Sequence, residues 1–175
     1  CIQKYQIQVI SHHFMNHKIE GLTIIDEYGI SFSYEKDNPK VKQNFTLCHE
    51  LGHFVLNHNG TCFTESIDNQ ENLLEREANI FSAVVLMPDI VLLSKIYYNY
   101  DSFQKVQENL GVSKQALYFR LLYLLRMYFP NRGDKIKQAI NNYIEMKNSL
   151  IHSLFRDIKQ QLIDEFKQYS PSLKV

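Results

Sequence analysis

The sequence predicts an α+β fold that is mostly helical, with a small β-hairpin and a C-terminal helical extension. Two short apolar runs lie close together near the N-terminus, on either side of a turn-forming stretch. Most of the remaining chain has apolar residues at helical spacing, in segments bounded by proline, glycine or serine. Of the 175 residues, 45% are hydrophobic and 22% are charged, which excludes a collagen-like or wholly disordered chain.

The N-terminal third is expected to form a helix, a hairpin and a second helix. Residues 1–20 carry apolar side chains at roughly helical spacing. Residues 21–25 and 30–34 flank the turn residues 26–29, and the second run alternates apolar with polar side chains as a half-buried strand does. Residues 42–57 then return to the helical pattern.

The rest of the chain is expected to be helical apart from one loop. Residues 60–70 are polar and predict that loop, whereas residues 71–87 predict a strong helix that Pro88 ends. Serine or aspartate caps and glycine or proline breaks predict further helices over 102–110, 113–129 and 134–170, and Asn141-Asn142 could divide the last of these.

The stretch from Asn131 to Gly133 is the predicted boundary. It separates a domain of residues 1–133 from a helical extension of residues 134–175. The extension is amphipathic, and its apolar spacing is irregular for a long coiled coil. We expect it to pack on the domain or on a partner, and a homodimer is one of the alternatives.

Charge and cysteine usage restrict the classes of function. Nineteen basic residues balance nineteen acidic ones, whereas proteins that grip a phosphate backbone usually have a basic excess. The three cysteines include no C-x-x-C pair, which favours a reducing, cytoplasmic compartment. No apolar run predicts a membrane span, and no signal peptide is recognised. Because the chain begins with Cys1, residues upstream could be missing.

One motif carries chemistry: His49-Glu50-Leu51-Gly52-His53, an H-E-x-x-H sequence within a predicted helix. Positions four apart on a helix differ by about 40°, so His49 and His53 point the same way. Two imidazoles so placed can bind one Zn²⁺, and Glu50 could act as general base on water. The alternative is a surface helix with two satisfied histidines.

A catalytic zinc needs a third protein ligand, and helical position favours Glu77. With Glu77 at zero on the 71–87 helix, the apolar Leu73 and Phe81 fall within about 40° of it, whereas Glu75 falls at about 160°, on the polar side. A carboxylate on an apolar face is costly unless it is paired or binds a metal. The alternative for Glu77 is a buried salt bridge.

Three segments together resemble the ImmA/IrrE family of zinc metallopeptidases. They are FTLCHELGH at 45–53, EREANIFSA at 75–83 and LMP at 86–88, in the order and at about the spacing typical of the family. The resemblance covers roughly residues 20–125. It implies a zincin-like metallopeptidase domain in which His49, His53 and Glu77 bind zinc and Glu50 is the catalytic glutamate.

The resemblance also implies a substrate. Members of the family often lie beside a helix-turn-helix repressor in a mobile element or phage, and cleave it. We therefore expect an endopeptidase with a protein substrate, dependent on zinc, although Mn²⁺ or Fe²⁺ would accept the same ligands. The alternative is a non-catalytic regulatory or toxin-antitoxin module of the same fold that binds a repressor.

Residues 106–120 and His58 have two interpretations each. Residues 106–120 look like a helix-turn-helix, but apolar residues crowd nearly every face of the second helix, so DNA binding is not expected. His58 could donate to the oxyanion of a peptidase reaction, and the alternative is a solvated helix end.

Overall fold

The computed structural model describes residues 6–15, 19–58, 62–66 and 73–169. Its elements are β1 (Gln8–His12), β2 (Ile19–Asp26), β3 (Gly29–Glu35), α1 (Lys40–Val55), β4 (Cys62–Ser66), α2 (Leu73–Leu86), α3 (Asp89–Leu93), the π-helix η2 (Ser94–Tyr98), α4 (Phe103–Leu110), α5 (Lys114–Tyr128), α6 (Gly133–Ile144) and α7 (Ser149–Tyr169). The predicted class, α+β and mostly helical, is confirmed. The chain divides into two compact units, Cys1–Leu86 and Met87–Val175.

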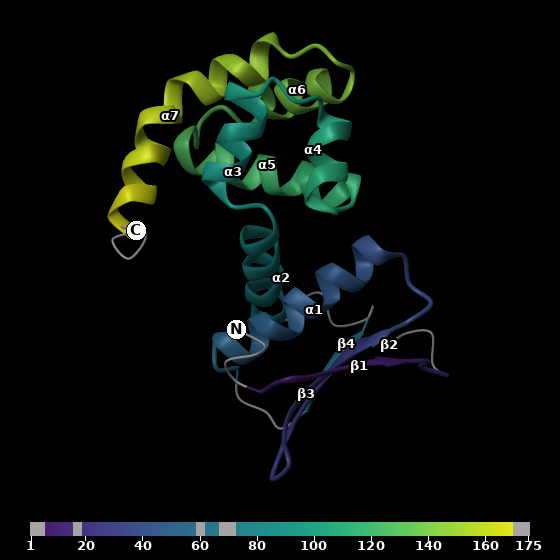
Figure 1. Cartoon of the computed structure of the whole chain (residues 1–175). Helices are drawn as coiled ribbons and strands as arrows, with labels where there is room; N and C mark the ends of the chain where they lie inside the picture. The colour runs from purple at the N-terminus through teal and green to yellow at the C-terminus, as the bar shows by residue number, and fades with distance from the viewer. Residues whose placement is uncertain (1–5, 16–18, 59–61, 67–72, 170–175) are drawn as a thin grey trace. The chain divides into compact units, whose positions relative to one another are not determined.

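The first unit contains a four-stranded sheet in the order β1-β3-β2-β4 (Figure 1). The predicted hairpin is its centre, because β2 pairs antiparallel with β3. The turn between them is ordered by Asp26, whose carboxylate accepts a hydrogen bond from the backbone N–H of Tyr28 at 2.9 Å. Gly29 follows with a φ of 129°, a conformation that favours glycine.

The two outer strands correct the sequence prediction. The prediction of a helix over residues 1–20 is wrong for residues 8–12, which form β1 and pair parallel with β3. Residues 1–5 and 16–18 lie outside the described part of the chain. The loop expected over 60–70 is wrong at β4, which pairs antiparallel with β2. All five β1 residues are exposed, so burial leaves no periodic signal in that strand. Backbone pairing with a neighbour, which any sequence can offer, creates these edges.

Helix α1 covers the sheet, and α2 packs against α1 (Figure 1). Phe32 from β3 is fully buried and meets the ring of Phe54 edge-on, with centroids 6.5 Å apart. Gly52 lies where α1 meets α2. A Cβ at Gly52 would lie 3.1 Å from Phe81 Cδ1, and 3.2 and 3.3 Å from backbone atoms of Ala78. The two helices therefore approach closely at Gly52.

Replacement of Gly52 by alanine is expected to destabilise the first unit by about 1 kcal/mol. The new methyl group would be overpacked against a neighbouring helix backbone, which costs about 1–3 kcal/mol and exceeds the helix-propensity gain of about 1 kcal/mol. Urea unfolding measures the effect. Gly133→Ala is the matched control, because its Cβ would meet only Arg126 at 4.0 Å. A Gly52→Ala protein as stable as the wild type would contradict the close approach.

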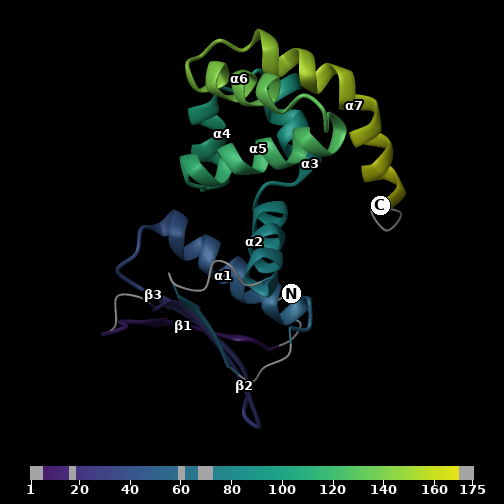
Figure 2. The same ribbon diagram turned by 180° about the vertical axis from the view of Figure 1, so that it is seen from behind.

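The second unit is a helical bundle in which α4, α5 and α6 lie side by side (Figure 2). The predicted caps are present: Ser102 accepts from the N–H of Lys105 at 3.3 Å, and Ser113 from that of Ala116 at 3.1 Å. Arg120 of α5 is buried, donates to the carbonyl of Met87 and pairs with Asp89 at the start of α3. Helices α3 and η2 lie outside the helices that the sequence pattern predicted.

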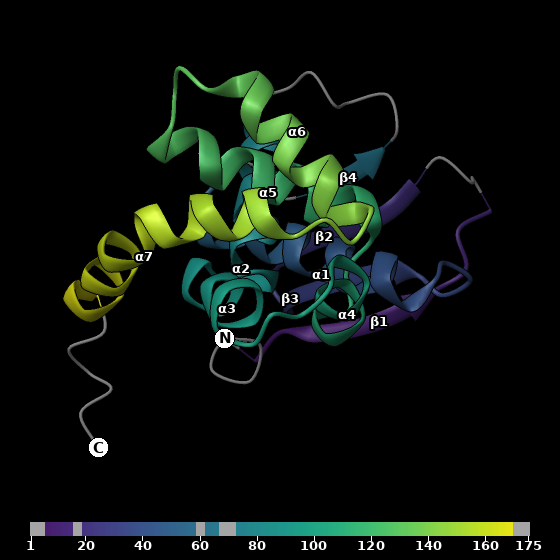
Figure 3. The same ribbon diagram turned by 90° about the horizontal axis from the view of Figure 1, so that it is seen from above.

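The predicted 134–170 helix is two helices, and the chain reverses direction between α6 and α7 (Figure 3). Both belong to the bundle: α7 packs on α3, and the Tyr143 hydroxyl of α6 donates to the Asp101 carbonyl at 2.6 Å. The observed division at 86/87 thus differs from the predicted boundary at 133/134.

Among the described residues, no single helix is both long and apolar enough to cross a membrane; only α2 taken together with α3 and η2 reaches that length and composition.

Candidate metal centre

Helix α1 brings the two histidines of the H-E-x-x-H motif together, as the spacing predicts. The Nε2 atoms of His49 and His53 lie 3.0 Å apart, and the ring centroids 4.7 Å apart. Both side chains are buried. Two imidazole nitrogens therefore meet at one point on the side of α1 that faces α2.

The carboxylate that joins them comes from Glu75 of α2. Its Oε2 lies 3.0 Å from His49 Nε2, and its Oε1 lies 3.5 Å from His53 Nε2. One ligand atom from each of the three residues lies within 4.8 Å of the other two. Glu75 is mostly buried, with 13% of its side chain exposed. His49, His53 and Glu75 are called the metal centre below.

Glu77 does not lie at the metal centre. Its side chain is 47% exposed, and its Oε2 lies 3.1 Å from Nε2 of His58. The prediction that Glu77 occupies the buried face of this helix is wrong. The buried residues of α2 are Ala78 and Ser82, three and seven positions after Glu75 and therefore on the same side of the helix, and Ala78 lies against Gly52 of α1. The apolar stripe that included Leu73 is the more exposed side.

Hydrogen bonds behind the two histidines fix which nitrogen carries the proton. Asn79 Oδ1 can only accept, and it lies 3.1 Å from His49 Nδ1, so that nitrogen donates. His58 donates from Nε2 to the Glu77 carboxylate, so its Nδ1 is free to accept from His53 Nδ1 at 2.8 Å. The neutral forms of His49 and His53 therefore both direct an Nε2 lone pair toward Glu75.

The buried site needs a positive charge, because the Nε2 lone pairs of His49 and His53 and the carboxylate of Glu75 converge there. Partial burial raises the pKa of Glu75, but when His49 and His53 are protonated their hydrogen bonds and charges outweigh it and bring the pKa to about 2. Glu75 is thus a carboxylate at neutral pH. Either a proton on an imidazole or a divalent cation can supply the positive charge, so protons and metal compete for the same nitrogens.

The spacing of the three residues fits zinc. A tetrahedral ion with ligand bonds of about 2.0–2.1 Å places neighbouring ligand atoms about 3.3 Å apart. The observed separations between Nε2 and the other ligand atoms are 3.0, 3.0 and 3.5 Å. Two histidines and one glutamate are also a ligand set of catalytic zinc, which keeps its fourth position for water or substrate.

Glu50, the middle acid of the motif, is fully buried beside His49. Its carboxylate accepts a hydrogen bond from the hydroxyl of Thr23, which is also fully buried and comes from β2. The sheet therefore takes part in building the site, since it supplies a donor that restrains the carboxylate of α1.

Comparison with known families matches residues 2–122 to Peptidase_M78, described as the IrrE N-terminal-like domain. The chain belongs to this family. The Peptidase_M78 match confirms the resemblance to the ImmA/IrrE family and supports a zinc metallopeptidase-like fold. It extends through the first unit and into α5 of the second. A comparison with curated proteins finds no match.

Three residues of this Peptidase_M78 site were missed by the sequence analysis or interpreted differently. Asn79 follows Glu75 by four positions, and that spacing could have indicated a shared face. Thr23 had no signal in the sequence, because its contact with Glu50 spans 27 positions. His58 is not a solvated helix end: only 4% of its side chain is exposed, and its partners are His53 and Glu77.

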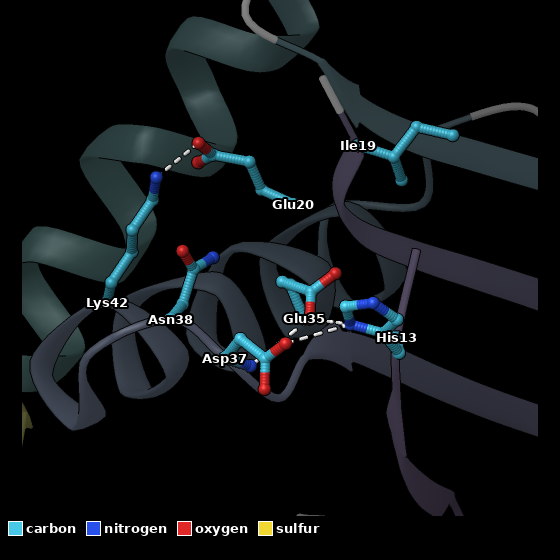
Figure 4. A pocket seen from close by; sticks show the side chains of 7 residues that line it. All are labelled: His13, Ile19, Glu20, Glu35, Asp37, Asn38 and Lys42. Carbon is cyan, nitrogen blue, oxygen red and sulfur yellow. Dashed lines mark hydrogen bonds and ion pairs between the residues drawn. The ribbon is translucent and has the colours of Figure 1, made fainter. Parts of the chain in front are cut away.

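A second group of side chains lines a hollow beside the turn between β3 and α1 (Figure 4). His13 Nδ1 lies 2.9 Å from Asp37 Oδ2 and 3.4 Å from Glu35 Oε1. Glu35 accepts hydrogen bonds from the backbone N–H groups of Asp37 and Phe14. These bonds lower the pKa of the Glu35 carboxyl, and the bond from Asp37 has the larger effect. Because His13 is largely exposed and Glu35 orders the backbone, this group carries no metal assignment.

Proposed function

We propose that the protein is a zinc-dependent endopeptidase. His49, His53 and Glu75 would hold the ion, and Glu50 would be the catalytic residue. The observation that carries this proposal is the convergence of two imidazole lone pairs on a carboxylate, with separations of 3.0–3.5 Å, next to a second buried carboxylate. The family supports the peptidase class. Glu75 is proposed as the third ligand in place of Glu77, because its carboxylate oxygens lie 3.0 and 3.5 Å from the Nε2 atoms of His49 and His53.

The chemistry follows from which groups can accept protons. A bound Zn²⁺ would supply Lewis acidity toward the scissile carbonyl and lower the pKa of water. Glu50, held by Thr23, would take the proton from the attacking water and later deliver it to the leaving amine.

The substrate class we propose is a regulatory protein, and in particular a helix-turn-helix repressor of a mobile element or phage. The likeness of residues 45–53 and 75–88 to the ImmA/IrrE motifs supports this. A repressor substrate would place the reaction in the cytoplasm. The proposal gives α4 and α5 no DNA-reading role, because five leucines of α5 (Leu117, Leu121, Leu122, Leu124 and Leu125) are buried in the second unit.

Metal removal tests this function. The zinc-loaded protein is expected to cut a purified helix-turn-helix repressor encoded beside it at a defined bond, as read by mass spectrometry. Treatment with a strong chelator is expected to stop cleavage, and one equivalent of Zn²⁺ to restore it. Zinc-loaded Glu50→Gln protein, purified in the same way, is the control for contaminating proteases. Cleavage that continues in chelator, or no cleavage by the zinc-loaded protein, would overturn the proposal.

Thr23 offers a second test, because its hydroxyl donates a hydrogen bond to Glu50. Thr23→Val removes the donor but keeps the volume, and we expect kcat to fall roughly 10- to 100-fold through loss of alignment. Thr23→Ser keeps a hydroxyl and should retain most of the activity. Zinc affinity should be unchanged in both variants. Equal kcat values for the valine and serine proteins would show that the hydrogen bond does not orient the base.

A further inference from the structure

We infer that His58 and Glu77 are positioning residues that orient His53 and thereby set how tightly the metal centre holds its ion. This inference rests on the metal site of the proposed function. It concerns affinity and not the reaction itself. The chain of contacts from His53 through His58 to Glu77 is called the His–His–Glu chain below.

The chain is built from the end of α1. Helix α1 ends at Val55, and Asn57 takes the left-handed conformation with a φ of 54°. That turn folds His58 back, so that its backbone N–H donates to the carbonyl of His53 at 3.1 Å. The two imidazoles then lie with centroids 4.9 Å apart and ring planes at 73°. His58 is therefore held by its backbone as well as by its ring.

Both ends of the chain are defined chemically. Glu77, from α2, is exposed to solvent and accepts from His58 Nε2 at 3.1 Å. The proton on Nε2 leaves His58 Nδ1 as an acceptor, and it lies 2.8 Å from Nδ1 of His53. His53 then presents a lone pair at Nε2 and has a fixed ring orientation. The donor and acceptor roles are consistent along the whole chain.

Such a partner strengthens a metal ligand in two ways. It holds the ring in the orientation that binding requires, and it raises the basicity of the nitrogen that faces the ion. Removing an outer partner of this kind typically weakens metal binding by about 10- to 100-fold. His49 is oriented by the neutral amide of Asn79 instead. The Glu77 carboxylate acts on His53 through the imidazole of His58.

The experiment measures zinc dissociation constants by competition with a chromophoric chelator. His58→Phe keeps an aromatic ring without nitrogens, and we expect about 10- to 100-fold weaker binding. Glu77 contacts His53 only through His58, so for Glu77→Gln we expect a smaller loss of zinc affinity, roughly 3- to 10-fold. Glu27→Gln is the matched control, since it removes the same charge from an exposed turn of the same unit, and its affinity should equal that of the wild type.

A second readout does not depend on affinity. In the zinc-loaded wild type, the His53 Nδ1 proton should exchange slowly with solvent and be visible by ¹⁵N-edited NMR; in His58→Phe it should be lost. If His58→Phe does not fold, Glu77→Gln still decides, because that side chain is exposed. Affinities within twofold of the wild type for Glu77→Gln would overturn the inference.

Other outcomes separate the inference from the function beneath it. Complete loss of zinc in Glu77→Gln would make Glu77 a ligand and overturn its positioning role. A wild-type protein that binds no zinc would remove the metal site and the inference with it. Tight zinc binding that is indifferent to Glu77 would remove only the inference and leave the proposed peptidase intact.

Discussion

Glu75→Gln is expected to abolish stoichiometric zinc binding. The loss of affinity should exceed about 100-fold, because residues that only hydrogen-bond to a ligand already contribute up to about 100-fold. A neutral amide oxygen is a poor zinc ligand, and its replacement of the carboxylate leaves two imidazoles alone. The substitution is nearly isosteric, so the contact between α1 and α2 should survive. Metal content after dialysis and a chelator-competition titration measure the effect.

Glu77→Gln is the matched comparison, because it makes the same chemical change two positions away on the same helix. It should keep one equivalent of zinc with modestly reduced affinity. A Glu75→Gln protein that holds one equivalent while Glu77→Gln holds none would reverse the assignment and restore the ligand that helical periodicity indicated. Retention of zinc by both variants would require a third ligand from elsewhere.

Glu50→Gln is expected to lower kcat for repressor cleavage by about 10²- to 10⁴-fold while zinc affinity stays close to that of the wild type. The glutamine amide cannot accept the proton of the attacking water, and general base catalysis contributes about that factor. The amide oxygen can still accept from Thr23, so the local fold is preserved. Single-turnover cleavage of the repressor, with zinc content measured on the same sample, gives both quantities.

The same variant separates the peptidase from its rival, a module that binds a repressor without cutting it. If Glu50→Gln cleaved at the wild-type rate, catalysis by this route would be wrong. If the variant cut nothing but still released expression of the repressed gene, the non-catalytic interpretation would be favoured. Loss of both cleavage and gene release is the expected result.

The sequence predicted those parts of the site that depend on a single helix. His49, Glu50 and His53 lie within five residues, and the helical repeat alone brings the two imidazoles together. The third carboxylate depends on which face of α2 meets α1. The apolar pattern favoured Glu77, but Ala78, which lies against Gly52, and Ser82 are the buried residues of α2, and Glu75 lies on the same side of the helix as these two.

The fold shows the same division between local and non-local causes. The β2–β3 hairpin, α1, α2, α4 and α5 have caps, turns or repeats that can be recognised within a few residues. The edge strands β1 and β4 depend on pairing with distant backbone, and β1 is exposed at every position. The division at 86/87 depends on the packing of α6 and α7 with α3 and α5, which composition does not reveal.

The close approach of α1 and α2 at Gly52 has a kinetic consequence. Gly52 lies between His49 and His53 on α1, and Ala78 lies three residues after Glu75 on α2, so the three candidate ligands lie next to this close contact. An ion bound there would cross-link the two helices. Separation of the two helices would break up the set of three ligands, so the rate of zinc exchange should rise with the frequency at which this contact opens.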